Sequence, residues 1–142
     1  MERIMGLDVG SKTVGIAISD PLNLTAQGHS VLRWRSYAEC LDQLAWLIQQ
    51  FQITTIVVGL PKNMNNTIGS QGMAAQKFAE RLRRRTDLPV ILWDERLTTQ
   101  AAQKLLQEQG LDSRKQRGVV DMVAATFILE GYLASRKEVQ IN

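Results

Sequence analysis

Residues 4–19, IMGLDVGSKTVGIAIS, decide how the chain begins to fold. Two short apolar runs, 4–9 and 14–19, flank the turn-rich segment Gly10-Ser11-Lys12-Thr13. Apolar runs that are separated by a few turn-forming residues predict two antiparallel strands of a β-hairpin. A third strand is predicted over 30–35, after a polar loop. The chain is therefore expected to open with three antiparallel strands.

The pattern changes to alternating helices and buried strands after residue 36. Ser36 and Glu39 form a capping box for a helix that runs to about residue 51, and residues 53–60 form a continuous apolar run typical of a parallel strand buried on both faces. A short strand is predicted over 90–93. Further helices are predicted over 73–85, from 98 or 99 to 109, and over 118–135. Right-handed crossovers would place the two later strands parallel to the first, on its far side.

The predicted fold class is therefore α/β, with a five-stranded mixed sheet of three antiparallel and then two parallel strands, flanked by helices. The 142 residues, 44% hydrophobic and 22% charged, fit a single globular domain over 1–142. No apolar run is long enough to cross a bilayer and no leader-like segment opens the chain, so we expect a cytoplasmic protein without membrane contact. The single cysteine, Cys40, excludes an internal disulfide and a zinc site of clustered Cys and His.

Acidic residues stand where predicted elements begin or end. Asp8 lies near the end of the first strand, Asp94 and Glu95 follow the strand over 90–93, and Asp121 lies in the first turns of the last helix. Open α/β sheets bind ligands at the carboxyl ends of their strands, so these carboxylates are expected to meet at one end of the sheet. Side chains alternate along a strand, so only one of Asp94 and Glu95 is expected to face that site, and alternation alone leaves open which one.

Each carboxylate also has a purely structural explanation. Asp8 can bond to backbone amides of the Gly10 turn, and Asp121 can stabilise the positive N-terminus of its helix. Together, however, carboxylates from three separate elements form a hard-oxygen site that suits Mg²⁺ or Mn²⁺. Two such ions about 4 Å apart can activate water for attack on phosphorus, as in two-metal nucleases. The sequence thus predicts a catalytic metal site at the end of the sheet.

Basic residues suggest an anionic partner, in keeping with the net charge of +3. Six of them are expected around the rim of the site, where they would hold a phosphate backbone by contacts largely blind to sequence: Lys12, Lys62, Arg96, Arg114, Lys115 and Arg117. The last three are expected on a flexible rim before the final helix. A second basic cluster, residues 81–85, has a simpler explanation, because cations at a helix end favour its negative pole.

Four segments together resemble the YqgF/RuvX family of ribonuclease H-like proteins: residues 6–12 (GLDVGSK), 58–64 (VGLPKNM), 94–99 (DERLTT), and Asp121 with Ala124, Ala125, Ile128 and Leu129. They occur in the family's order and extend over nearly the whole chain. The resemblance implies a ribonuclease H-like fold and a metal-dependent phosphodiesterase centred on Asp8, Glu95 and Asp121. Thr13 and Asn66 depart from the family's pattern, where a basic residue and glycine are usual, and these departures concern the grip on the substrate.

Family members are described as candidate Holliday junction resolvases and as nucleases that mature the 5′ end of 16S ribosomal RNA. The resemblance implies the second role, with structured RNA and ribosomal particles as partners, and leaves branched DNA as the alternative substrate. The sequence does not decide between RNA and DNA, between Mg²⁺ and Mn²⁺, or between a monomer and a homodimer.

Two other functions fit parts of the sequence. Asp8-Val9-Gly10, followed by Lys12 and Gly15, also resembles the phosphate-binding hairpin of actin-like ATPases, but those enzymes clamp ATP between two domains and this chain has residues for one. A non-catalytic nucleic-acid-binding or ribosome-associated module would have no need of all three acidic groups. Both alternatives are therefore less favoured than a nuclease.

Overall fold

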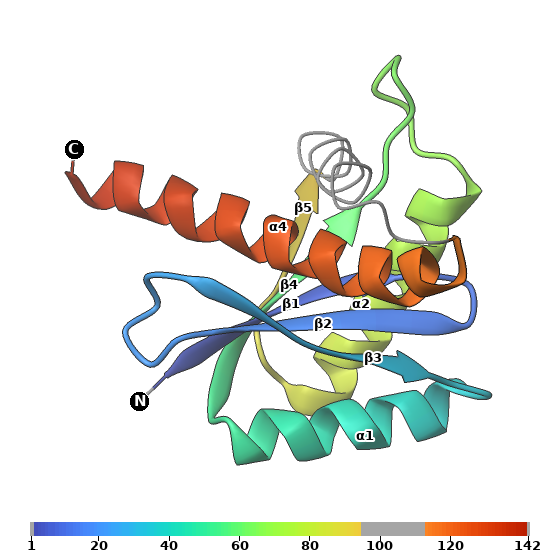
Figure 1. The fold of residues 1–142 in the computed structure, drawn as a ribbon, viewed down its shortest axis with the longest axis horizontal. Coiled ribbons are helices and arrows are strands. Elements are labelled where there is room, and N and C mark those ends of the chain that lie inside the picture. The colour runs from blue at the N-terminus through green and yellow to red at the C-terminus, as the bar shows by residue number, and fades with distance from the viewer. Residues whose placement is uncertain (1, 95–112, 142) are drawn as a thin grey trace.

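The computed structural model describes residues 2–94 and 113–141, the second range with side chains over 121–136. Five strands form one sheet in the order β3-β2-β1-β4-β5. They are β1 (Arg3–Val9), β2 (Thr13–Ser19), β3 (Ala26–Arg33), β4 (Ile53–Leu60) and β5 (Val90–Asp94). The first three pair antiparallel, and β4 and β5 run parallel to β1. The predicted mixed sheet is confirmed (Figure 1).

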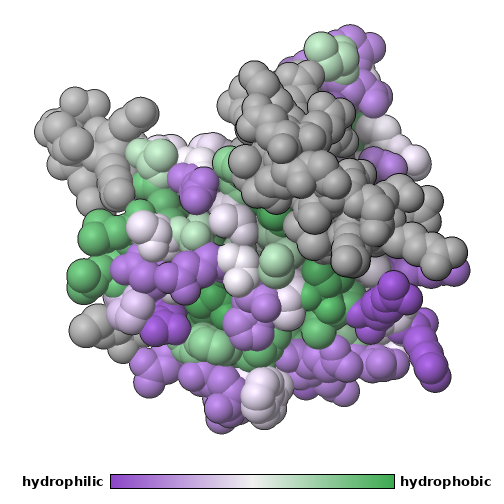
Figure 2. All heavy atoms as spheres, in the orientation of Figure 1, coloured by the Kyte–Doolittle hydropathy of each residue, from purple (hydrophilic) through white to green (hydrophobic). Residues whose placement is uncertain are grey.

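Helices cover both faces of this sheet. α1 (Tyr37–Gln50) and α2 (Ser70–Thr86) lie on one face, and α4 (Ser113–Ile141) crosses the other (Figure 1). α1 begins where the Ser36 hydroxyl accepts a hydrogen bond of 3.2 Å from the backbone N–H of Glu39, as the capping box predicts. Figure 2 shows a hydrophilic surface along the lower edge of the molecule, over α1, because only one side of this helix packs on the sheet.

Strand alternation divides the apolar side chains between two cores. One core lies between the sheet and the pair α1 and α2, and its fully buried members include Leu44 and Phe78. The other lies under α4 and includes Ile128. Successive residues of β4, Val57 and Val58, belong to different cores. This strand is therefore apolar along its whole length, as a strand buried on both faces must be.

β3 begins four residues earlier than predicted, at Ala26 rather than at residue 30. It is an edge strand, and its first half is polar because one face meets solvent, so the apolar pattern missed it. β3 pairs with β2 from Ala26 onward, opposite Ser19. The turn between the two strands is held by the Asp20 carboxylate, which accepts hydrogen bonds from the backbone N–H groups of residues 22, 24 and 25. These bonds, that from Thr25 foremost, lower the pKa of the Asp20 carboxyl.

α4 corrects the prediction for the C-terminal region. The helix begins at Ser113 and ends at Ile141, whereas the sequence pattern gave bounds of 118 and 135. Gly118 costs a helix about 1 kcal/mol relative to alanine but does not end it, and packing of later turns on the sheet offsets that cost. The expected flexible rim over residues 114–117 is thus the first turn of a helix. None of the described helices is both long and apolar enough to cross a membrane.

Cys40 provides a test of how tightly α1 packs, because its side chain is fully buried. Burial raises the pKa of its thiol from 9.0 to about 11, and the Glu39 carboxylate adds to the shift. The buried thiol favours the folded state as long as it is neutral. This stabilisation of the folded state is fully present below pH 9.0 and is lost as the pH rises through about 11. Since the thiolate is the reactive form, we expect native protein at pH 8 or so to react with a thiol reagent far more slowly than urea-unfolded protein. Equal rates would mean that α1 opens readily.

Candidate active site

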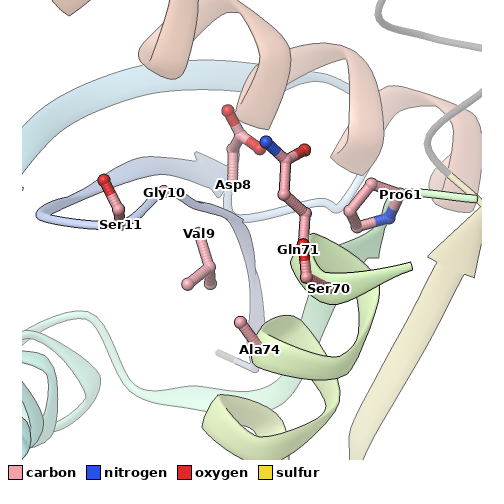
Figure 3. Close-up of a pocket in the computed structure, with 8 residues that line it drawn as sticks. All are labelled: Asp8, Val9, Gly10, Ser11, Pro61, Ser70, Gln71 and Ala74. Atoms are coloured by element: carbon pink, nitrogen blue, oxygen red, sulfur yellow. The ribbon is translucent and has the colours of Figure 1, made fainter. Parts of the chain in front are cut away.

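Asp8 lies on the α4 side of the sheet, near the carboxyl end of β1. Alternation in β1 assigns Ile4, Gly6 and Asp8 to this side, since Ile4 belongs to the α4 core and a Cβ at Gly6 would lie 2.8 Å from a side-chain carbon of α4. Across the hairpin, Asp8 pairs with Gly15 of β2. Figure 3 shows the half-buried carboxylate directed toward α4, whereas Val9 points to the opposite side.

Asp121 is brought to the same place by α4. An ideal Cβ on Gly15 would lie 2.0 Å from the carbonyl oxygen of Asp121 and 2.4 Å from its carbonyl carbon. A side chain has no room there, so only glycine lets the helix backbone rest on the hairpin. Because Gly15 is the pairing partner of Asp8, this close approach puts Asp8 and Asp121 on adjoining segments.

The hairpin also holds the Asp121 carboxylate. Thr13 Oγ1 donates a hydrogen bond of 2.7 Å to Asp121 Oδ2, and both residues are half-buried. Thr13 lies two residues before Gly15 and therefore on the same face of β2. In the sequence, Thr13 stands out only as a departure that concerns the grip on the substrate, and this contact is not predicted. The spacing of two from Thr13 to Gly15 to Ala17, all small residues on one face, is the signal that could have found it.

A pocket of about 360 Å³ opens beside Asp8 at the carboxyl ends of β1 and β4. Its lining comes from the β1–β2 turn, the end of β4 and the first turns of α2: Asp8, Val9, Gly10, Ser11, Pro61, Ser70, Gln71 and Ala74. Figure 3 shows Gln71 reaching from α2 toward the Asp8 carboxylate. The helix predicted over 73–85 did not include Ser70 and Gln71, but α2 starts at Ser70 because Gly69 adopts the extended N-cap conformation. The N-terminus of α2, with its backbone N–H groups, therefore borders the pocket.

Asp94 ends β5 on the other face of the sheet. Val90 packs with the core under α1 and α2, whereas Trp93 packs with the core under α4. By alternation Asp94 belongs to the face of Val90, opposite to that of Asp8. The described part of β5 therefore gives Asp94 no place beside Asp8 and Asp121.

The other predicted site residues are described to different extents. Lys12 is exposed in the β1–β2 turn, and Lys62 follows β4 and lines a cavity of about 230 Å³ that shares Pro61 with the Asp8 pocket. For Arg114, Lys115 and Arg117 the structure describes a helical backbone in α4. Outside the described residues lie Glu95, Arg96 and the helix predicted from 98 or 99 to 109.

The two described carboxylates suit a hard divalent cation. Asp8 and Asp121 supply the oxygen ligands that Mg²⁺ and Mn²⁺ prefer, and Thr13 orients one of them as outer residues commonly orient metal ligands. Among the described side chains, no group of three His, Cys, Asp or Glu is placed to hold a metal ion. A three-carboxylate site would therefore need a ligand from beyond the described ranges.

Known proteins resemble this chain over nearly its whole length. A family model described as "RuvX: Holliday junction resolvase" matches residues 2–135. A Bacillus cytotoxicus protein named "Putative pre-16S rRNA nuclease" is 51% identical over 136 residues, which cover 94% of this chain and 99% of the relative. A protein of the same name from Desulforamulus reducens is 48% identical over 133 residues, covering 94% of this chain and 97% of its own.

Solved structures agree on the fold. T. thermophilus RuvC in complex with Holliday junction substrate matches with a TM-score of 0.62 over 97% of both chains, and at 14% identity this likeness concerns the ribonuclease H-like fold alone. The family match is more specific, because it extends through Asp8, the β1–β2 hairpin and Asp121. Together with relatives that are about half identical along their full length, it shows that this chain belongs to the RuvX family.

Proposed function

We propose that the chain is a divalent-metal-dependent nuclease that hydrolyses phosphodiester bonds in structured nucleic acid, and that its role is the 5′-end maturation of pre-16S ribosomal RNA. The main support is the convergence of Asp8 and Asp121 on Gly15 beside a pocket. The relatives named for pre-16S rRNA favour this substrate. The role places the protein in the cytoplasm, with ribosomal precursor particles as partners.

The proposed metal ligands are Asp8, Glu95 and Asp121. Glu95 is preferred to Asp94 because alternation in β5 assigns Asp94 to the face opposite to Asp8. When bound, Mg²⁺ or Mn²⁺ supplies an activated water and neutralises charge on the phosphate and the departing oxygen. The chain's own part is to hold its carboxylates on packed elements: Asp8 on a central strand and Asp121 on a helix seated on that strand's partner.

The substrate backbone is proposed to lie along the basic rim. The residues assigned to it are Lys12, Lys62, Arg96, Arg114, Lys115 and Arg117. The N-terminus of α2 and Ser11 border the pocket. A phosphate beside Asp8 could therefore accept hydrogen bonds from the backbone N–H groups of α2 and from the Ser11 hydroxyl. None of these groups selects a base, so the fold of the RNA would decide where it is cut.

The test is cleavage of 16S rRNA precursor with an unprocessed 5′ end, in Mg²⁺, in Mn²⁺ and in EDTA, with wild type, Asp8→Asn and Asp121→Asn. We expect metal-dependent cuts at the mature 5′ end by wild type alone. Equal binding by all three proteins with no cleavage by any of them would instead identify a non-catalytic module.

A second candidate function is Holliday junction resolution, because the family model carries that description. A four-way junction has two-fold symmetry, so a resolvase is expected to act as a homodimer, whereas an RNA trimmer can act as a monomer. Paired symmetric cuts in a four-way DNA junction by a dimer, without cuts in the rRNA precursor, would decide for the resolvase. Solution mass with and without the junction gives the oligomeric state.

The Thr13 hydrogen bond gives a separate prediction. Thr13→Val keeps the side-chain shape but removes the donor to Asp121 Oδ2, whereas Thr13→Ser keeps the donor. Loss of an outer residue that orients a ligand typically weakens metal affinity about 10- to 100-fold. We expect Thr13→Val to weaken Mn²⁺ binding in calorimetry and to raise the Mn²⁺ concentration for half-maximal cleavage by about tenfold, and Thr13→Ser to stay near wild type. Unchanged Mn²⁺ binding in both variants would mean that Asp121, as held by Thr13, is not a metal ligand.

A further inference from the structure

Three of the four arginines near the end of α2 are held in ion pairs. Arg83 and Arg84 both bind Glu80, at 2.7 and 3.1 Å, and Arg85 binds Asp42 of α1 at 2.6 Å. The hydrogen bond from Arg83 is the main cause of the lowered pKa of the Glu80 carboxyl. Each of these three cations is therefore paired within the protein, with two carboxylates between them, and the explanation of a solvated helix end suits them.

Arg81 is held differently. Its guanidinium lies over the Tyr37 ring, 4.1 Å from the ring centre, and the Lys77 ammonium lies 6.0 Å from the same centre. Tyr37 is in turn fixed by Trp34, whose ring centre is 5.1 Å away. In the described part of the chain, Arg81 and Lys77 are exposed and no carboxylate lies within ion-pair distance of either. We call Tyr37, Lys77 and Arg81 the Tyr37 patch.

The Tyr37 patch continues the surface of the Asp8 pocket. Ala74 lines that pocket, and Lys77 and Arg81 follow it along α2 at helical spacings of three and four residues. Seven residues of α-helix extend about 10 Å. At about 3.4 Å per stacked nucleotide, this length corresponds to about three nucleotides.

The β1–β2 turn fills the interval between the pocket and the patch. Ser11 lines the pocket, and the next residue, Lys12, accepts a hydrogen bond of 3.1 Å at its carbonyl from the backbone N–H of Trp34. Arg33 and Arg35, on either side of Trp34, are exposed. In Figure 2, strongly hydrophilic residues gather at the right-hand end of the sheet, where the β1–β2 turn and the end of β3 lie. Exposed basic residues thus lie on the segments between the pocket and the patch.

We propose that the Tyr37 patch binds the phosphate backbone of the strand that leaves the Asp8 pocket, about three nucleotides from the cleaved bond. A guanidinium stacked on an aromatic ring keeps its N–H donors in the plane of the group, where they can bind phosphate oxygens, and the ring restricts its movement. Lys77 adds a second cation. The inference rests on the proposed nuclease function for the direction of the strand, but the binding it describes needs no cleavage.

The experiment compares two double variants of the full chain that lose the same charge from the same helix. Lys77→Gln/Arg81→Gln removes the cations of the patch, and Arg83→Gln/Arg84→Gln removes cations already paired with Glu80. Affinity is measured in EDTA, over a range of salt concentrations, for RNA and for DNA of one sequence. The sequence is that around the mature 5′ end of 16S rRNA, the position at which the proposed function expects the cut. Each nucleic acid is tested ending at that position and with extensions of about six nucleotides on either side of it.

For the extended strands, we expect the patch variant to bind more weakly than wild type and its salt slope to fall by about 1.4, or 0.7 for each lost phosphate contact. Wild type would then lose about seven times more affinity than the variant between about 50 and 200 mM salt. RNA and DNA should respond alike, and the paired-arginine variant and all strands without extension should change little.

An equal loss of affinity in both double variants would mean that net charge alone is responsible, and the inference would be wrong. It would also be wrong if the patch variant weakened short and extended strands alike. This experiment measures binding and not cleavage, so the two proposals can fail separately. If the protein binds as expected here but cuts no substrate in the cleavage test, the nuclease proposal is wrong and the patch remains a binding site.

Discussion

Asp8→Asn is expected to reduce phosphodiester cleavage on the order of 10³- to 10⁴-fold, while nucleic-acid binding stays within a few-fold of wild type. Asparagine has nearly the same shape as aspartate, so the packing of β1 against α4 should survive. It lacks the negative charge, however, and a neutral amide compensates a divalent cation poorly. The loss should therefore fall on the catalytic rate and on Mn²⁺ affinity, with little change in the midpoint of unfolding.

The double variant makes this prediction sharper. If Asp8 and Asp121 serve one metal site, Asp8→Asn/Asp121→Asn should be hardly slower than the worse single variant, because groups that act as a unit are strongly non-additive. Asp42→Asn is the matched control, since it removes an exposed carboxylate that pairs with Arg85 on the far side of the sheet. Single-turnover rates at saturating metal give the comparison. If the rate losses of the two single variants multiply in the double variant, the two aspartates do not share a site. A slow rate for the Asp42→Asn control would count against a shared site in the same way.

The backbone of the fold could be predicted because it depends on local patterns. The apolar run Ile53–Leu60 matches β4 residue for residue, and the capping box at Ser36 marks the start of α1. Both signals are strong since they report a physical requirement that nearby residues meet by themselves: burial on two faces, or a bonded helix terminus. From these elements, strand order and the parallel direction of β4 and β5 followed correctly.

The site was harder because its contacts join distant parts of the chain. The hydrogen bond from Thr13 to Asp121 connects residues 108 positions apart, and no local pattern encodes it. The first half of β3 was missed because an edge strand can be polar, and the start of α4 was missed because tertiary packing overrides the weak helix propensity of Gly118. The sequence predicts that Asp8 and Asp121 meet at one end of the sheet, and the structure places them on adjoining segments. What brings these segments together, the missing side chain of Gly15, became visible only in three dimensions.

Gly15→Ala is therefore expected to be the most disruptive single-methyl change in the site. Its Cβ would fall 2.0 Å from a backbone oxygen of α4, and a backbone atom inside a helix cannot move without the helix. Overpacking of a core commonly costs about 1–3 kcal/mol, and with rigid backbone on both sides we expect a value of about 3 kcal/mol. Alternatively, α4 shifts away from β2 and carries Asp121 with it, and a misplacement of about 1 Å can cost roughly 10²-fold in rate.

Gly28→Ala separates this effect from a general intolerance of alanine beneath α4. A Cβ at Gly28 would lie 2.9 Å from Cγ of Met122, at first sight an equally forbidden distance. That atom belongs to a flexible side chain, which can change rotamer at small cost. Urea unfolding and cleavage rates should thus find Gly28→Ala close to wild type, and Gly15→Ala either unstable or folded and inactive. A stable, fully active Gly15→Ala enzyme would mean that α4 need not touch the hairpin. It would also mean that the activity does not depend on Asp121.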